Sequence, residues 1–177
     1  MSKIKWVLDP THSEIQFKVK HLMITTITGS FKKIDASAET EGDDFSNASV
    51  NFSASTASVD TGNEQRDGHL TSADFFSSEK FPEMQFISSK FTEKSLENFM
   101  LEGNLTIKGV TKPVILDVEF GGIAKDPYGN VKAGFTLSGK INRKDFGLTW
   151  NVPTEAGGLL VSEGVRIVSE IQLVKQV

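Results

Sequence analysis

The sequence predicts an all-β protein, an eight-stranded antiparallel barrel with one short helical segment near residues 61–76. Three observations support this fold class. Apolar and polar side chains alternate with a period of two along most of the chain, as in strands with one dry and one wet face. Turn-forming residues separate the alternating segments. The 61–76 segment alone has a helical pattern. The turn signals are Asp9-Pro10, Glu41–Asp44, Lys108-Gly109, Gly121-Gly122, Asp126–Asn130 and Ala156–Gly158.

The alternation defines the strands in chain order. Within Glu14–His21, the apolar residues Ile15, Phe17 and Val19 share one face, and the residues between them are polar. The same pattern, weaker in the second, fourth and fifth segments, predicts eight strands in total. They are 14–21, 24–33, 48–54, 84–92, 99–108, 114–120, 131–141 and 165–173. Because each strand has only one dry face, we expect an antiparallel sheet, since the strands of a buried parallel sheet are apolar on both faces.

Small residues on the dry faces favour a closed barrel over a sandwich. In a sandwich, two such faces must interdigitate to full density, whereas a closed eight-stranded barrel can hold one ligand and has no exposed edge. The chain has 13 Phe but only 2 Trp and 1 Tyr, which suits an apolar interior that is either packed or ligand-lined. The small inward residues are Ala48, Ala54, Ser88, Gly103, Gly139 and Ser169.

The 61–76 segment combines helical spacing with several functional side chains. Thr61 and Glu64 have the spacing of a capping box. The segment contains the cluster Arg66-Asp67-Gly68-His69, and a helix this short must dock on the rest of the protein. Phe75 and Phe76 are the expected docking residues. We therefore expect a helix that closes or braces one end of the barrel.

Length and composition limit the class of protein. The 177 residues suit a single domain spanning 1–177. A net charge of −4 argues against a nucleic-acid partner. The chain has no Cys and no apolar run long enough for a membrane-spanning helix. Residues 1–6 lack the apolar core of a signal peptide, so we expect a cytoplasmic protein, or a periplasmic one if a signal sequence has been removed.

The histidines do not predict a metal site. His12 and His21 are nine residues apart, which would place them on opposite faces if one regular strand spanned both, and we expect His12 to lie in the turn after Asp9-Pro10. No metal-binding spacing of histidines occurs. We predict no metal and no cofactor, and expect His12 and His69 to make hydrogen bonds in a turn and in helix packing. No Gly-x-Ser-x-Gly motif is present, although a catalytic Asp67–His69 pair with a serine stays open.

Two polar residues extend dry faces and are therefore candidate binding residues. His21 continues the face of Phe17 and Val19, either as a hydrogen-bonded core residue or as a polar group at a cavity mouth. Arg143 extends the dry face of the 131–141 strand, where a buried charge needs a partner. That partner is a carboxylate or an anionic ligand group. The candidate carboxylates are Asp145, Asp67 and Asp74.

These motifs together resemble the YceI-like family of lipid-binding barrel proteins. The resemblance covers about residues 6–174. It rests on Trp6–Ser13 with Phe17 and His21-Leu22, Gly29 and Phe31, Arg66–Leu70, Asp74–Phe76, Phe81-Pro82 and Phe86, Gly103–Val114, Arg143, Asp145–Leu148 and Trp150. It implies an elongated lipocalin-like barrel whose lumen holds a long apolar chain, such as a polyisoprenoid, an isoprenoid quinone or a fatty amide. It also implies a homodimer and, frequently, a periplasmic location.

The sequence thus favours a binding or carrier protein for a linear lipid. One alternative is an enzyme that acts on a small substrate through His and Asp residues near the barrel mouth. Another is a ligand-free stress-response interaction module with a solid core. For the carrier, the residues predicted to contact the lipid chain or its head group are Phe17, Val19, His21, Phe52, Phe86, Leu116, Phe135, Leu137 and Arg143.

Overall fold

The computed structural model describes residues 2–155 and 158–176. This part of the chain contains eleven β-strands, one α-helix and three short 3₁₀ helices. The helix is α1 (Glu64–Thr71). The strands are β1 (Lys3–Leu8), β2 (Glu14–His21), β3 (Thr25–Phe31), β4 (Ile34–Glu41), β5 (Asp44–Ser55), β6 (Val59–Asp60), β7 (Glu83–Ser95), β8 (Asn98–Ile107), β9 (Val110–Lys125), β10 (Val131–Asn142) and β11 (Gly164–Lys175). None of the described helices is long and apolar enough to cross a membrane.

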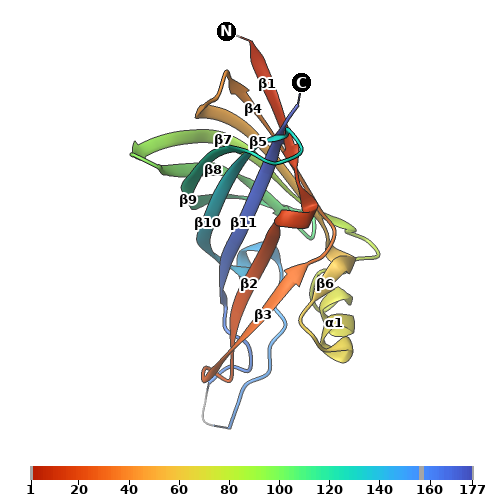
Figure 1. Ribbon diagram of the computed structural model, residues 1–177. Coiled ribbons are helices and arrows are strands. Elements are labelled where there is room, and N and C mark those ends of the chain that lie inside the picture. Colours follow the sequence, from red (N-terminus) through yellow and green to blue (C-terminus); the bar gives the residue numbers. More distant parts are fainter. Residues whose placement is uncertain (1, 156–157, 177) are drawn as a thin grey trace.

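The strands close into one elongated antiparallel barrel (Figure 1). β1 and β2 both pair with β11, at successive positions along it. β1 pairs with Leu173–Lys175, and β2 pairs with Arg166–Glu170. β3 and β4 likewise run along β2 and β1, and β5 continues into β6. β1 with β2, β3 with β4, and β5 with β6 each form one long, interrupted strand. Together with β7 to β11 they give a barrel of eight strand positions. The predicted all-β, eight-stranded antiparallel barrel is confirmed.

Two strands extend beyond the alternation seen in the sequence. β1 places Trp6 in the core, and β4 continues the predicted 24–33 strand as far as Glu41. Its inward residues include Ala36, Ala38 and Thr40, which are too small to produce a visible apolar pattern. These strands were not predicted because hydrophobic alternation reveals only strands with large inward residues. A strand can pair through its backbone without such residues.

Aromatic residues fill the half of the barrel near the chain termini. Trp6 is fully buried and donates from Nε1 to Thr40 Oγ1 over 2.9 Å. The Phe45 ring lies 5.0 Å from the Trp6 ring and 4.9 Å from the Phe135 ring, measured between centroids. Phe120 also contacts both Phe45 and Phe135. This cluster closes one end of the barrel, so any internal space must lie toward the opposite end.

Asp9 holds the break between β1 and β2 against β10. Its carboxylate accepts a 2.6 Å bond from Lys132 Nζ and a 2.7 Å bond from Thr11 Oγ1, and it pairs with His12 Nδ1 over 2.8 Å. The Lys132 ammonium and the bonds from Thr11 and His12 hold the pKa of the Asp9 carboxyl well below its ordinary value. The expected hydrogen-bonding role of His12 in this turn is confirmed.

We expect Asp9→Asn to lower the free energy of unfolding by about 2 kcal/mol at pH 7, because it removes charged hydrogen bonds. A depressed folded-state pKa gives stability that is present above the unfolded-state pKa of about 4 and is lost as the pH falls through the folded-state value. The difference between wild type and variant should therefore shrink in acid. Urea denaturation at pH 7 and pH 3 measures it. Asp43→Asn is the control, since Asp43 is exposed and pairs with Lys175 at the surface. A difference independent of pH would contradict the assignment.

Candidate ligand-binding site

A cavity of about 590 Å³ lies in the half of the barrel away from the chain termini. Phe45 and Phe135 of the aromatic cluster form its floor, together with Phe91. Among the residues that line it, Lys20 at the end of β2 and Gln65 in α1 are exposed, and they mark the mouth. Nearly all of the wall between floor and mouth is apolar. The volume lies within the range of about 300–1,000 Å³ typical of small-molecule sites.

The structure brings all nine predicted residues to the wall of this one cavity. They come from β2, β5, β7, β9 and β10 and from the residue that follows β10, so closure of the barrel, and not sequence proximity, assembles them. Their contact with a ligand stays a prediction. The nine are Phe17, Val19, His21, Phe52, Phe86, Leu116, Phe135, Leu137 and Arg143.

Most of the small inward residues named from the sequence do not border the cavity. Of the six, Ser169 is the one that lines the cavity. A Cβ at Gly139 would lie 2.4 Å from Cδ2 of Leu116, because that side chain already occupies the space beside the glycine. The missed strand β4 instead contributes the small wall residues Ala36 and Ala38. Gly139 in the sequence therefore marked close packing, and the small residues that border the cavity are Ala36, Ala38 and Ser169.

Gly103 gives a direct test of this close packing. A Cβ at Gly103 would lie 2.5 Å from the backbone oxygen of Ile87 and 2.5 Å from the Phe86 ring. We expect Gly103→Ala to destabilise the barrel by about 2–3 kcal/mol, because a backbone oxygen cannot move aside without disturbing the sheet. Gly68→Ala in α1 is the control, since open space surrounds that position and alanine favours a helix. Urea denaturation of both variants checks this, and equal stabilities would contradict the packing argument.

Arg143 binds backbone carbonyls and no carboxylate. The side chain is 3% exposed. Nε donates to Ser162 O over 2.8 Å, and Nη1 donates to Leu148 O over 2.6 Å and to Trp150 O over 2.9 Å. Nη2 donates to Val161 O over 3.2 Å. The pairing of Arg143 with Asp145, Asp67 or Asp74 is therefore wrong.

The guanidinium group organises the chain at the cavity mouth. Its four bonds tie the segments on either side of residues 156–157 to the end of β10. Among the described residues, one N–H of Nη2 has no acceptor. Burial lowers the pKa of Arg143 from its ordinary value, while the Glu163 carboxylate opposes the shift. Arginine still stays charged in proteins. A buried cation thus borders an apolar cavity.

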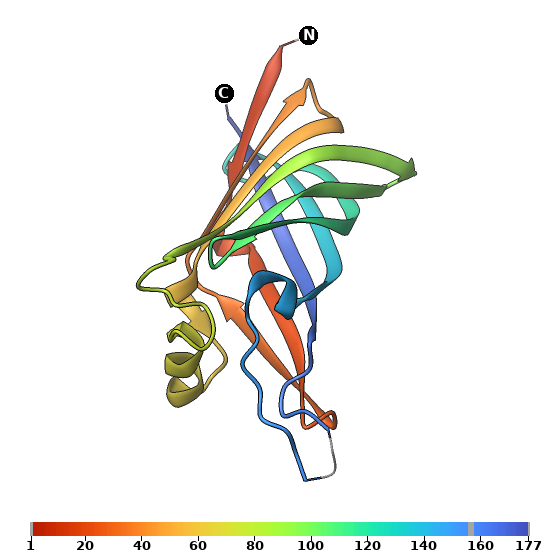
Figure 2. The ribbon, with the colours of Figure 1, turned by 180° about the vertical axis from the view of Figure 1, so that it is seen from behind.

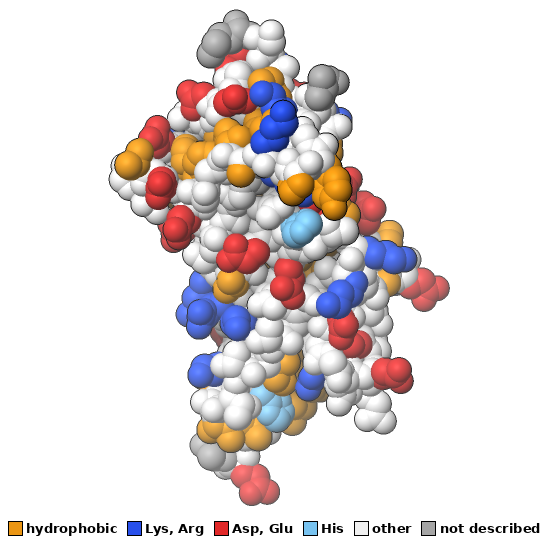
Figure 3. Space-filling view, in the orientation of Figure 1, with side chains coloured by type: hydrophobic (Ala, Val, Ile, Leu, Met, Phe, Trp, Pro, Cys, Tyr) orange, Lys and Arg blue, Asp and Glu red, His pale blue; other side chains and the backbone are white. Residues whose placement is uncertain are grey.

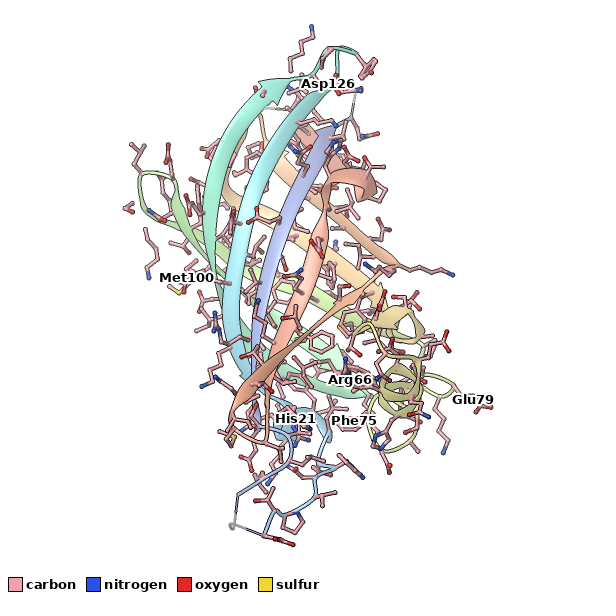
Figure 4. All side chains as sticks on the ribbon, turned by 60° about the horizontal axis from the view of Figure 1, so that its bottom comes forward. His21, Arg66, Phe75, Glu79, Met100 and Asp126 are labelled. Carbon is pink, nitrogen blue, oxygen red and sulfur yellow. The ribbon has the colours of Figure 1, made fainter. Side chains whose placement is uncertain are left out.

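Helix α1 flanks the mouth, because its residues Gln65, Arg66 and His69 line the cavity. Figure 4 shows Arg66 at the same end of the barrel as His21 and Phe75, and Asp126 at the opposite end. Phe75 and Phe76 are buried and dock the segment, as predicted. The predicted Thr61 cap is wrong, because Asn63 caps the helix by accepting from the Arg66 N–H. Thr61 lies two residues before the true cap, and its hydroxyl forms hydrogen bonds with Asp67 and Arg66 instead.

The Arg66–His69 cluster is structural. Asp67 Oδ1 accepts from the Thr61 hydroxyl over 2.6 Å, and Arg66 Nε donates to the same hydroxyl oxygen over 2.6 Å. His69 Nε2 pairs with Asp74 over 2.9 Å. Its ring meets Trp150 edge-on at 4.5 Å between centroids. The expected packing role of His69 is confirmed, and the cluster forms a brace beside the cavity mouth.

Within the described ranges, His12 does not form a proton relay, and no metal-binding cluster is assembled. His12 uses one nitrogen, Nδ1, for both Asp9 and Thr11, whereas a relay needs both ring nitrogens. No three His, Asp or Glu side chains in those ranges meet at metal-binding distance.

Sequence reasoning missed several wall residues in the 148–161 region. Trp150, Leu160 and Val161 line the cavity although their segment forms no regular strand. The available signal was a large aromatic residue and an apolar run within a stretch rich in Gly, Pro and Asn. Alternation could not assign them because β-bridges join this segment only at isolated positions, such as His21 with Val161.

The sequence matches the YceI-like domain family over residues 6–173. A UPF0312 protein of Staphylococcus epidermidis is 38% identical over 163 residues, which cover 92% of each chain. A UPF0312 protein of Staphylococcus aureus is 36% identical over 162 residues, which cover 91% of this chain and 92% of that protein.

Solved structures share the barrel. The crystal structure of a Campylobacter jejuni YceI protein superposes with a TM-score of 0.77 at 34% identity, covering 89% of this chain and 90% of that chain. A polyisoprenoid-binding domain from Saccharophagus degradans, implicated in plant cell wall breakdown, superposes with a TM-score of 0.70, covering 97% of this chain and 98% of that chain. Its 15% identity shows a common fold alone. Since the family match spans nearly the whole sequence and the relatives exceed 30% identity across it, this protein belongs to the YceI-like family.

Proposed function

We propose that this protein binds and carries one long, linear, apolar molecule inside the barrel. The observation that supports this most strongly is the deep cavity with an apolar wall and a single end at which exposed residues line it. Protein interiors rarely leave voids larger than a water molecule, because each void loses dispersion contacts along its wall. A cavity of this size is therefore expected to be filled by an apolar ligand.

The ligand class that fits is a polyisoprenoid, such as an isoprenoid quinone or a prenyl phosphate, with a fatty amide as the second choice. A cavity that lies inside an elongated barrel and ends on packed aromatic rings suits a linear chain better than a fused ring system. The shared fold of the Saccharophagus degradans polyisoprenoid-binding domain supports this choice. In this arrangement the chain enters first, and the head group stays near His21 and the free N–H of Arg143.

The two alternatives have less support. A hydrolase of the Ser-His-Asp type would need a histidine that binds a carboxylate through one ring nitrogen and a hydroxyl through the other, whereas His12 contacts Asp9 and Thr11 through the same nitrogen and His69 pairs with Asp74. An interaction module with a solid core would have no cavity, and the interior contains about 590 Å³ of free space. Carriage of a lipid explains both the space and its apolar wall. The homodimer remains a prediction from the family resemblance.

Trp150 provides a built-in probe for binding. It lines the cavity, whereas Trp6, the other tryptophan, lies behind the aromatic floor. Titration of delipidated protein with isoprenoid quinones of increasing chain length should quench Trp150 fluorescence with one-to-one saturation. Affinity should rise with each isoprene unit, by up to about 0.8 kcal/mol per buried CH₂ group, and level off when the cavity is full. Trp150→Phe should abolish the signal. Absence of quenching by every chain length, with the barrel folded, would overturn the proposal.

A further inference from the structure

An exposed apolar tip stands beside the cavity mouth. It consists of Leu22, Met23 and Ile24 in the turn between β2 and β3, which are 42%, 58% and 75% exposed. Exposed Val152 lies on the neighbouring segment, which the Leu22 N–H joins through a 2.8 Å bond to Leu160 O. Figure 2 shows this turn at the end of the molecule opposite the termini, and Figure 3 shows hydrophobic surface there. Single exposed apolar residues are common, but a consecutive run is not.

The backbone of the tip is unfavourable for its residues. The turn closes through Ile24 N–H donating to His21 O over 3.1 Å, and its central residues Leu22 and Met23 have φ of 53° and 60°. Such type I′ turns prefer Asn-Gly, because positive φ crowds a bulky side chain. Folding alone would favour Asn-Gly here. Exposed apolar side chains on a strained backbone therefore indicate a function outside the fold.

A row of cations crosses the outer face of the sheet on the strands that lead to the tip. The strand register aligns Lys140 of β10, Arg166 of β11 and Lys18 of β2, and Lys20 lies two residues nearer the tip. Within the described part of the chain, none of the four forms an ion pair, although Lys144 nearby pairs with Glu163. Figure 3 shows basic side chains above the apolar end on this face of the molecule.

On the outer face of β2, β9, β10 and β11, the carboxylates lie farther from the tip than this row of cations. Glu14 and Glu170 face each other in the register of β2 and β11, and Asp117 of β9 stands opposite Ser138 of β10. Other carboxylates do lie at the mouth: Glu64, Asp145 and Glu155 are exposed, and Glu163 pairs with Lys144. In a chain of net charge −4, the face formed by β2, β10 and β11 nevertheless combines cations with an apolar tip at the mouth end. This combination is complementary to an anionic lipid surface, where basic side chains meet head groups and apolar side chains enter the interface.

We propose that the mouth end docks on an anionic bilayer, with Leu22, Met23 and Ile24 inserted at the head-group boundary. The proposal rests on the proposed function, because docking there lets a lipid pass between bilayer and cavity without crossing water. A surface of three apolar side chains and a few cations gives reversible attachment, as exchange of a carried lipid requires.

Sedimentation with sucrose-loaded vesicles tests docking separately from ligand uptake. We expect at least tenfold stronger partitioning to vesicles of phosphatidylglycerol and phosphatidylcholine in a 1:3 ratio than to pure phosphatidylcholine, and weaker partitioning at high salt. The variant Leu22→Asn/Met23→Gly should reduce partitioning at least tenfold while keeping or raising stability, because Asn-Gly suits the turn. Leu96→Asn, in a residue 84% exposed in the turn between β7 and β8, should change nothing.

Charge variants complete the test. Replacing Lys18, Lys140 and Arg166 with Gln should weaken partitioning about fivefold for each charge removed. Replacing Lys90, Lys94 and Lys112, three exposed lysines elsewhere, is the matched control. Quinone titration without vesicles should be unchanged in all of these variants.

The two proposals fail in distinguishable ways. A wild type that takes up quinone but never sediments with anionic vesicles overturns docking and leaves the proposed function standing. Sedimentation without quinone uptake supports docking and overturns the proposed function. If the wild type forms a dimer that the Asn-Gly variant loses, and no vesicle binding occurs, the tip is an interface between two copies and docking is overturned.

Discussion

Ser169→Phe should abolish lipid binding while leaving the barrel folded. Ser169 is a buried cavity residue on β11, opposite Leu137 in the strand register. A phenyl ring added there would fill the space that the ligand chain needs. We expect ligand affinity to fall at least about 100-fold, or about 2.8 kcal/mol at 1.4 kcal/mol per factor of ten. Quinone titration by Trp150 fluorescence measures the change.

The same variant also tests whether the cavity is open. In a packed interior an added ring costs about 1–3 kcal/mol, whereas in open space the cost is small. The free energy of unfolding without ligand should therefore change by less than about 1 kcal/mol. Ser138→Phe, on the neighbouring strand but on the exposed outer face, is the control and should bind lipid normally. Normal lipid affinity in Ser169→Phe would show that the ligand binds elsewhere.

Arg143→Met should cause the largest loss of stability among single changes at the cavity mouth. The substitution leaves the carbonyls of Leu148, Trp150, Val161 and Ser162 without their donor. We expect a loss of about 3–5 kcal/mol in the free energy of unfolding, as for removal of one partner from a buried charged network. Urea denaturation measures it.

Two further variants separate charge from geometry. Arg143→Lys keeps the positive charge but cannot reach four separated carbonyls with a planar fork, so it should recover only part of the loss. Arg166→Met removes an exposed arginine from the neighbouring strand and should change stability by less than about 0.5 kcal/mol. If Arg143→Met were as stable as wild type, the carbonyl network would not hold the mouth in place.

The strand pattern was predictable because it depends on side chains that the sequence displays directly. Large inward residues such as Phe17 and Val19 alternate with lysine, and this alternation alone identified the antiparallel sheet and its dry faces. β4 escaped prediction because Ala36 and Ala38 are small. The helix was located correctly, but its N-cap is Asn63 and not Thr61. Both residue types can cap a helix, and they lie only two positions apart. The sequence does not show that Asp67 binds the Thr61 hydroxyl.

The residues of the candidate site were more predictable than their interactions. All nine predicted positions reach the cavity because strand parity decides which side chains point inward. The partners of Arg143 were not predictable, because backbone carbonyls carry no residue identity, and a guanidinium group can be satisfied by any four of them that the fold brings near. The cavity volume was equally hidden, since Gly139 is covered by Leu116 while Ser169 stays open.

Native mass spectrometry of protein purified without detergent tests lipid carriage most directly. The barrel is predicted to carry one molecule per chain, with solvent extraction releasing a linear isoprenoid or a fatty amide, and Ser169→Phe should appear at the mass of the bare chain. A wild type found only at the bare mass, and still bare after incubation with a bacterial lipid extract, would contradict lipid carriage in the barrel.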